Sequence, residues 1–216
     1  GIGLTRTEHM FFEGERLPIV QSMILSEPNS EEEQGYLDQL LPFQRSDFYG
    51  LLKVMEGLPV IIRLMDPPLH EFLPSFDDLL VEVTTLRITG KDAKRLVEAE
   101  EMLAEVEKLR ESNPMLGLRG VRLGIMRPAI NKMQVQAIFE AACDLKNEGV
   151  DVHPEVMIPV TNNPNELKIM KELLEAIAKK VMEEKNVQVE YMFGTMLEMP
   201  RACILADQMA EYADFF

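Results

Sequence analysis

Short apolar runs alternate with longer amphipathic segments along most of this chain. The run at residues 60–64 stays apolar until Arg63, as a strand that is buried on both faces does. The amphipathic segments carry apolar residues at the spacing of one helix face. The expected strands lie within residues 2–6, 60–64, 115–123, 153–160 and 187–196. This strand–helix order predicts an α/β protein with a parallel sheet and crossover helices.

Helix signals fill the segments between the expected strands. Ser30 and Glu33 have the spacing of a capping box and predict a helix to about residue 41, with another beginning at Ser46. Asn163-Pro164 is followed by Glu166, a second strong helix start. The remaining helices are expected at residues 91–110, 135–148 and 201–212. Residues 66–90 look like an irregular insertion with some helical content, so residues 1–216 are predicted to form a single, partial barrel domain.

Two architectures fit a parallel sheet: an open doubly wound sheet and a closed (β/α)8 barrel. The sequence has neither the glycine pattern of a dinucleotide-binding turn nor a P-loop. Polar residues instead follow several different strands, as they do at the mouth of a barrel. A complete barrel takes about 250 residues and eight strands. We therefore predict a partial (β/α)8 barrel with about five of the eight units, and the abrupt ends suggest a piece of a longer protein.

Composition narrows the partners and the compartment. The formal net charge of −15 argues against binding to nucleic acid or to anionic lipid. No apolar run is long enough to cross a membrane, and no signal peptide is recognisable. Cys143 and Cys203 are not in a metal-binding spacing, so both are expected to be free, buried thiols. A reducing compartment is expected, cytoplasmic or, in a eukaryote, organellar.

Charged side chains follow four of the expected strands. Arg6, Arg63 and Arg119 end the apolar part of three of them, and Glu198 follows the last. Arginine's planar fork suits carboxylate and phosphate oxygens. A carboxylate such as that of Glu198 is a ligand that Mg²⁺ prefers. Together these residues predict a site for a small substrate that carries carboxylate or enolate oxygens and phosphate.

A structural interpretation of the same residues stays open. An arginine after a strand commonly forms a salt bridge at the rim of a sheet, and such pairs contribute little. Glu8 and Asp66 stand close in sequence to Arg6 and Arg63 and could serve as their partners. Glu198 taken alone could equally be a solvated rim carboxylate.

Four motifs bear a family resemblance that spans essentially the whole chain. Residues 1–12 read GIGLTRTEHMFF, residues 63–72 read RLMDPPLHEF, residues 113–120 read NPMLGLRG and residues 194–202 read GTMLEMPRA. They resemble the phosphoenolpyruvate-utilising barrel of the pyruvate, phosphate dikinase family. The first and third motifs are shared with Enzyme I of the sugar phosphotransferase system. The DPPLHEF stretch is characteristic of the dikinases.

The resemblance implies a phosphotransferase activity and roles for specific residues. The family interconverts ATP, phosphate and pyruvate with AMP, diphosphate and phosphoenolpyruvate through a phosphohistidine on a swinging domain. Its barrel binds pyruvate or phosphoenolpyruvate with Mg²⁺ and mediates homodimer contacts. Carried over to this chain, Arg6 and Arg63 hold the substrate, Arg119 assists at the phosphoryl group, and Glu198 binds Mg²⁺ and reaches the substrate through it.

The resemblance also implies that parts of the active site lie outside these residues. The family's second magnesium carboxylate, its acid cysteine and its phosphohistidine have no counterpart here, so no residue of this chain is assigned a certain catalytic role. The chain alone is expected to be inactive. Two alternatives stay open: a non-catalytic barrel used for dimerisation or ligand sensing, and a phosphotransferase like Enzyme I. Asp66-Pro67-Pro68 argues against the latter.

Overall fold

The computed structural model describes residues 1–110, 113, 115 and 117–216, which form two compact units. The first, which we call the sheet unit, comprises Gly1–Asp66 and Arg119–Phe216. The second, the hairpin unit, comprises Pro67–Leu118. The prediction of one barrel domain over residues 1–216 therefore stays a prediction, and each unit is described by itself.

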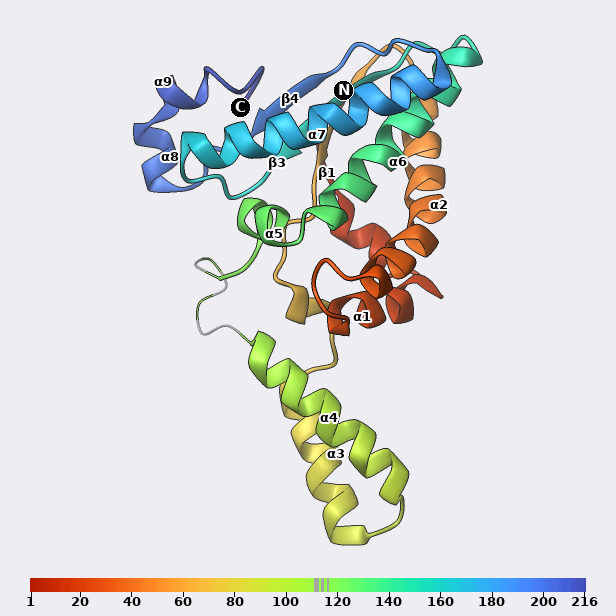
Figure 1. The fold of residues 1–216 in the computed structure, drawn as a ribbon, viewed down its shortest axis with the longest axis vertical. Coiled ribbons are helices and arrows are strands. Elements are labelled where there is room, and N and C mark those ends of the chain that lie inside the picture. The colour runs from red at the N-terminus through yellow and green to blue at the C-terminus, as the bar shows by residue number, and fades with distance from the viewer. Residues whose placement is uncertain (111–112, 114, 116) are drawn as a thin grey trace. The chain divides into compact units, whose positions relative to one another are not determined.

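Four parallel strands form the sheet of the first unit, in the order β1-β2-β3-β4 (Figure 1). They are β1 (Ile2–Arg6), β2 (Pro59–Arg63), β3 (His153–Ile158) and β4 (Met192–Thr195). Arg6 pairs with Arg63 in the ladder, and Arg63 pairs with Met157. The carboxyl ends of the strands therefore meet at one edge. The predicted α/β class with a parallel sheet is confirmed, and this sheet is consistent with part of a (β/α)8 barrel.

The strand expected within residues 115–123 is wrong. Arg119 is the N-cap of a short helix, α5 (Gly120–Met126), and Leu116 lies outside the described residues. Gly120 has a φ of 52°, which a strand does not allow. The apolar residues Val121 and Leu123 belong to α5, and their side chains are buried. A short apolar run interrupted by glycine cannot be assigned by its pattern alone. A further parallel bridge to the sheet comes instead from Phe215, which pairs with Gly194.

The other helices of the sheet unit are α1 (Arg16–Leu25), α2 (Glu31–Val54), α6 (Pro128–Asn147), α7 (Pro164–Lys185), α8 (Pro200–Ile204) and α9 (Ala206–Met209), and a 3-10 helix, η1 (Thr7–Phe11), follows β1. The helix expected from Asn163-Pro164 is confirmed as α7, and the one expected at residues 135–148 is part of the longer α6. The single helix expected at residues 201–212 is wrong, because two short helices, α8 and α9, lie there. The two helices predicted between Ser30 and residue 56 are one helix, because α2 continues through Pro42. Its apolar face is buried on both sides of the proline, which offsets the lost hydrogen bond.

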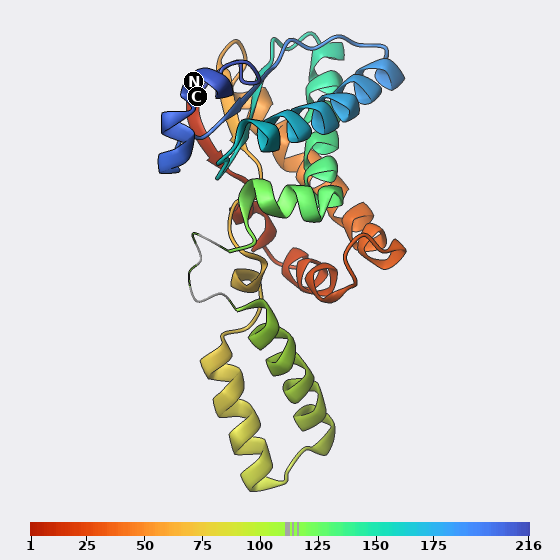
Figure 2. The same ribbon diagram turned by 60° about the vertical axis from the view of Figure 1, so that its left-hand side comes forward.

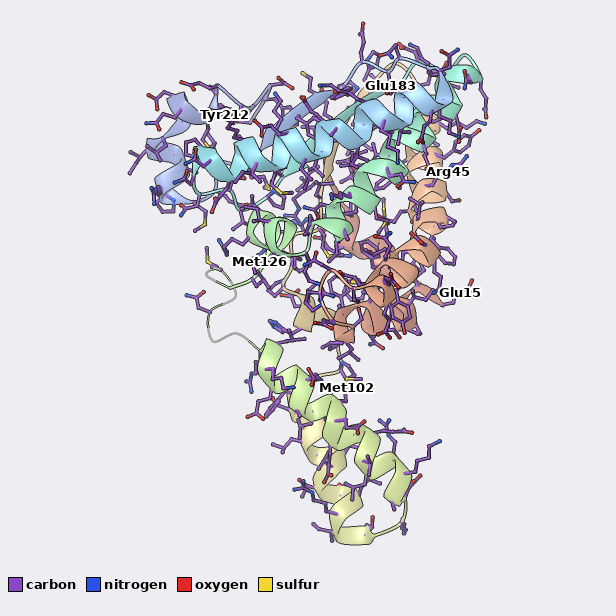
Figure 3. The ribbon with its side chains drawn as sticks, viewed as in Figure 1. Glu15, Arg45, Met102, Met126, Glu183 and Tyr212 are labelled. Atoms are coloured by element: carbon purple, nitrogen blue, oxygen red, sulfur yellow. The ribbon has the colours of Figure 1, made fainter. Side chains whose placement is uncertain are left out.

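The main core lies between the sheet and a layer of three helices. Figures 1 and 2 show α2, α6 and α7 against one face of the sheet, with α6 in the middle. Asp144 of α6 joins all three helices at the surface. Its Oδ1 accepts from Lys185 of α7 at 2.8 Å, and its Oδ2 accepts from Arg45 of α2, which is labelled in Figure 3.

Two antiparallel helices make up most of the hairpin unit (Figure 2). They are α3 (Phe76–Thr89) and α4 (Ala93–Leu109), and a 3-10 helix, η2 (Leu69–Phe72), precedes them. The helix predicted at residues 91–110 is confirmed as α4. Residues 66–90, which were expected to be an irregular insertion with some helical content, instead contain η2 and the regular helix α3. Two ion pairs join the helices, Arg95 with Glu82 at 2.7 Å and Arg87 with Glu100 at 2.7 Å. The helix end expected at Asn113-Pro114 falls partly outside the described residues.

The two cysteines differ in their surroundings. Cys143 on α6 is fully buried, and burial raises the pKa of its thiol. Cys203 lies on α8 and is exposed, so the expectation of a second buried thiol is wrong. In the part of the chain that the structure describes, no helix has the length and apolar character needed to span a membrane.

Gly120 provides a test of the packing between α5 and the end of β3. A Cβ at Gly120 would lie 2.8 Å from the carbonyl oxygen of Pro159, and its φ of 52° disfavours other residues. We expect Gly120→Ala to lower the free energy of unfolding by about 1–3 kcal/mol. Gly50→Ala, within α2 and with nothing within 4 Å of the added atom, should raise it by about 0.5–1 kcal/mol. Urea unfolding measures both, and an unchanged Gly120→Ala protein would contradict the close approach.

Thiol labelling tests the assignment of the cysteines. We expect Cys203 to react with a maleimide in the native chain, because it is exposed, and Cys143 to react only after unfolding. Mass spectrometry of native and urea-treated protein counts the labels. Cys203→Ser should abolish native labelling and Cys143→Ser should leave it unchanged; the reverse pattern would show that the burial is misassigned.

Candidate functional site

Arg6 and Arg63 end two neighbouring strands at the carboxyl edge of the sheet. They are partners in the β1–β2 ladder, so their main chains lie side by side. Arg6 is exposed, and it makes no ion pair with any residue that the structure describes. Arg63 is only 8% exposed. The ladder thus places Arg6, which has no ion pair among the described residues, next to the buried Arg63.

Two carboxylates hold the buried guanidinium of Arg63. Its Nη2 lies 2.5 Å from Glu8 Oε1, and its Nη1 lies 2.9 Å from Asp66 Oδ2. A guanidinium this deeply buried requires such partners, because an unpaired buried charge is strongly destabilising. Arg63 Nε and Glu8 Oε2 are buried without a hydrogen-bond partner among the described residues. The pair therefore keeps one buried donor and one buried acceptor without a hydrogen bond to a described residue.

Arg119 reaches the same place from the start of α5 and not from a strand. Its Nη2 lies 2.8 Å from Asp66 Oδ2, the oxygen that also contacts Arg63. The main-chain N–H of Gly120 donates to the carbonyl oxygen of Asp66 at 3.1 Å. We call Glu8, Arg63, Asp66 and Arg119 the strand-end cluster. The charges of its two arginines and two carboxylates cancel, so the partners that the structural interpretation required are present. Arg6 adds a positive charge that no described residue pairs with.

Glu198 follows β4 at the same edge. Among the described residues, it forms no ion pair with the strand-end cluster. Its side chain is exposed, and Oε1 accepts a hydrogen bond from the N–H of Val160 at 2.8 Å. Val160, just after β3, has a φ of 60°, which is unusual for a β-branched residue and often marks a functional segment. Thr195 Oγ1 donates to the carbonyl oxygen of Ile158 at 2.8 Å and ties the ends of β3 and β4.

The residues present fit Mg²⁺ to a limited extent. The described part of the chain contains no group of three or more His, Cys, Asp or Glu side chains that could hold a metal ion. Glu198 offers one carboxylate, with Oε1 occupied by the Val160 N–H and Oε2 not engaged by a described residue. Mg²⁺ commonly takes one or two protein carboxylates and leaves its other positions to substrate and water. Glu198 therefore fits the role of a single protein ligand.

Sequence reasoning missed the conformation of Val160, which no residue pattern signals. The expected strand around Arg119 was wrong, and the role of Arg119 as a site residue stays a prediction. Glu8 and Asp66 were named only as competing partners of the arginines. The structure shows that this pairing holds Arg63 and Arg119 in one cluster at the carboxyl edge.

Comparisons with known proteins cover the whole chain. Residues 1–216 match the family model described as PEP-utilising enzyme, PEP-binding domain. The chain is 49% identical to pyruvate, phosphate dikinase 1, chloroplastic, of Arabidopsis thaliana, over all of the chain and 22% of the relative. It is 48% identical to pyruvate, phosphate dikinase of Entamoeba histolytica over all of the chain and 24% of the relative. For the enzyme of that name from Giardia intestinalis the identity is 49% over 23% of the relative.

The chain spans about a quarter of the length of these curated relatives. The motifs that carry the resemblance lie within the matched residues, and the resemblance to pyruvate, phosphate dikinases is confirmed at this level. Since the family model covers every residue and the relatives match throughout, the chain belongs to the PEP-binding domain family of PEP-utilising enzymes.

Proposed function

We propose that the carboxyl edge of the sheet binds phosphoenolpyruvate or pyruvate as the substrate-binding part of a pyruvate, phosphate dikinase. The observation that carries this proposal is the pairing of Arg6 with Arg63 at the ends of neighbouring parallel strands. Arg63 also belongs to the strand-end cluster, whose positive and negative charges cancel. The dikinase names of the relatives support the reaction class. The proposed reaction converts ATP, phosphate and pyruvate into AMP, diphosphate and phosphoenolpyruvate.

The arginines have different roles in this proposal. Arg6 is exposed and unpaired among the described residues, so it can turn its guanidinium fork to carboxylate or phosphate oxygens. Arg63 is fixed by Glu8 and Asp66, and its orientation is therefore set before substrate arrives. Donors that need no reorganisation stabilise developing charge well. Arg119, at the other end of the cluster, assists at the phosphoryl group.

Glu198 is the proposed protein ligand of Mg²⁺. The Val160 N–H holds Oε1 and leaves Oε2 for the metal ion. Bound Mg²⁺ would supply Lewis-acid stabilisation of negative charge on a substrate oxygen. The chain's own residues bind and orient the substrate and neutralise its charge. The phosphoryl group would come from a phosphohistidine domain of the full-length enzyme, and we propose a homodimer in a cytoplasmic or organellar compartment.

Arg6→Ala in the full-length protein tests the anion site without disturbing a buried pair. We expect kcat/KM for pyruvate phosphorylation to fall about 100-fold to 1000-fold, because one charged donor to the reacting group is lost. Phosphorylation of the histidine by ATP should be unchanged. Arg63→Ala should abolish pyruvate phosphorylation, but it also removes the ion-pair partner of the buried Glu8 and one of the two partners of Asp66, so a loss of activity could come from misfolding.

The matched control for Arg6→Ala is Arg87→Ala, an exposed arginine of α3 in the hairpin unit. It should change neither partial reaction. Normal turnover of pyruvate by the Arg6→Ala protein would contradict the proposed function. Phosphoryl transfer to a small carrier protein would point to the Enzyme I type, and substrate binding without turnover would point to a sensing module.

Glu198→Gln and Glu198→Ala together test the metal role. Gln keeps an oxygen for the Val160 N–H but binds Mg²⁺ poorly, whereas Ala loses both functions. We expect the Mg²⁺ concentration for half-maximal pyruvate phosphorylation to rise about 10-fold or more in both variants. Only Glu198→Ala should also lose about 1 kcal/mol of stability. A Glu198→Gln enzyme with an unchanged Mg²⁺ dependence would remove Glu198 from the metal site.

A further inference from the structure

A buried glutamine on α6 joins the ends of β1 and β2. Gln134 is fully buried. Its Oε1 accepts a hydrogen bond from the N–H of Met65 at 2.9 Å, and its Nε2 donates to Thr7 Oγ1 at 3.0 Å. Thr7 directly follows Arg6, and Met65 is two residues beyond Arg63. One side chain therefore connects the segments that carry both arginines.

The directions of these hydrogen bonds are fixed by chemistry. A main-chain N–H can only donate, so the side-chain oxygen of Gln134 must face Met65 and its NH₂ group must face Thr7. The Thr7 hydroxyl, having accepted that bond, donates its own proton to the carbonyl oxygen of Arg63 at 2.9 Å. The second N–H of Gln134 lies 3.3 Å from Oε1 of Gln44, which is itself buried on α2.

We propose that Gln134 is a positioning residue for Arg6 and Arg63, an inference that rests on the proposed function of these arginines. The β1–β2 ladder ends at the Arg6–Arg63 pair. Beyond that pair, the bonds from Gln134 to Thr7 and Met65, and from Thr7 to Arg63, continue the connection between the two segments. They fix the spacing of the two strand ends from which the guanidinium groups project.

No other residue type of this size satisfies the same bonds. Methionine has the length of glutamine but would leave the buried Met65 N–H without a partner. Glutamate could accept from Met65 but has no N–H to donate to Thr7 and Gln44, and it would bury a charge. Loss of these bonds leaves the segments just beyond the ladder without a connection through Gln134, and a misplacement of about 1 Å at a reacting group can cost about 100-fold in rate.

Gln134→Met in the full-length protein is the primary test, with Gln136→Met as the matched control. Gln136 lies on the same helix, is partly exposed and bonds only Glu140 among the described residues. We expect Gln134→Met to lower kcat/KM for pyruvate phosphorylation about 10-fold to 100-fold, while phosphorylation of the histidine by ATP stays at the wild-type rate. Gln136→Met should match the wild type in both. Wild-type pyruvate kinetics in Gln134→Met, or an equal loss in both partial reactions, would overturn the inference.

Substitutions of Thr7 test the same hydrogen bonds at the partner of Gln134. They replace the primary test if the Gln134→Met protein does not fold. Thr7→Val removes the hydroxyl at almost constant shape, and Thr7→Ser keeps it. We expect Thr7→Val to reproduce the loss in pyruvate phosphorylation and Thr7→Ser to recover most of it. Equal defects in the two variants would assign the effect to packing and contradict the inference.

The outcomes separate this inference from the proposed function. Full-length wild-type protein that does not phosphorylate pyruvate, or whose activity survives Arg6→Ala, refutes the proposed function. Activity that depends on Arg6 but tolerates Gln134→Met and Thr7→Val refutes only the role of Gln134.

Discussion

The buried guanidinium of Arg63 can exist only because Glu8 and Asp66 pair with it. Asp66 in turn pairs with Arg119, and its carbonyl oxygen accepts from the N–H of Gly120. Asp66 and Arg119 are also the residues at which the chain leaves the sheet unit and returns to it. The same ion pairs therefore join the two segments of the sheet unit, Gly1–Asp66 and Arg119–Phe216, and fix the guanidinium of Arg63. Fold and candidate site depend on one set of charges.

Most of the fold could be predicted because its signals are local. A continuous apolar run marks β2, short segments rich in apolar residues mark β1 and β3, and the capping residues at Asn163 and Glu166 mark the start of α7. The errors lie where tertiary packing decides. Residues 115–123 are too short and too rich in glycine for a pattern to separate strand from helix, and the start of α5 depends on contact with Pro159. The α2 helix passes through Pro42 because its face is buried throughout.

The candidate site was predictable only in part, for a related reason. In a parallel sheet the carboxyl ends of the strands share an edge, so chain order alone brings Arg6, Arg63 and Glu198 to that edge. Order does not reveal which charges pair, and Asp66 could have faced solvent. The positive φ of Val160 and the hydrogen bonds of Gln134 arise from contacts between distant segments. Neither a valine nor a glutamine in the sequence predicts these features. Local patterns predict which residues form the candidate site, and long-range contacts give those residues their geometry.

The central claim is that phosphoenolpyruvate binds at the carboxyl edge through Arg6 and Arg63. A crystal structure of the protein with phosphoenolpyruvate and Mg²⁺ tests it most directly. The account predicts carboxylate or phosphate oxygens within hydrogen-bond distance of both guanidinium groups, with the metal ion on Glu198. Phosphoenolpyruvate bound at another surface, or at this edge without contact to either arginine, would contradict it.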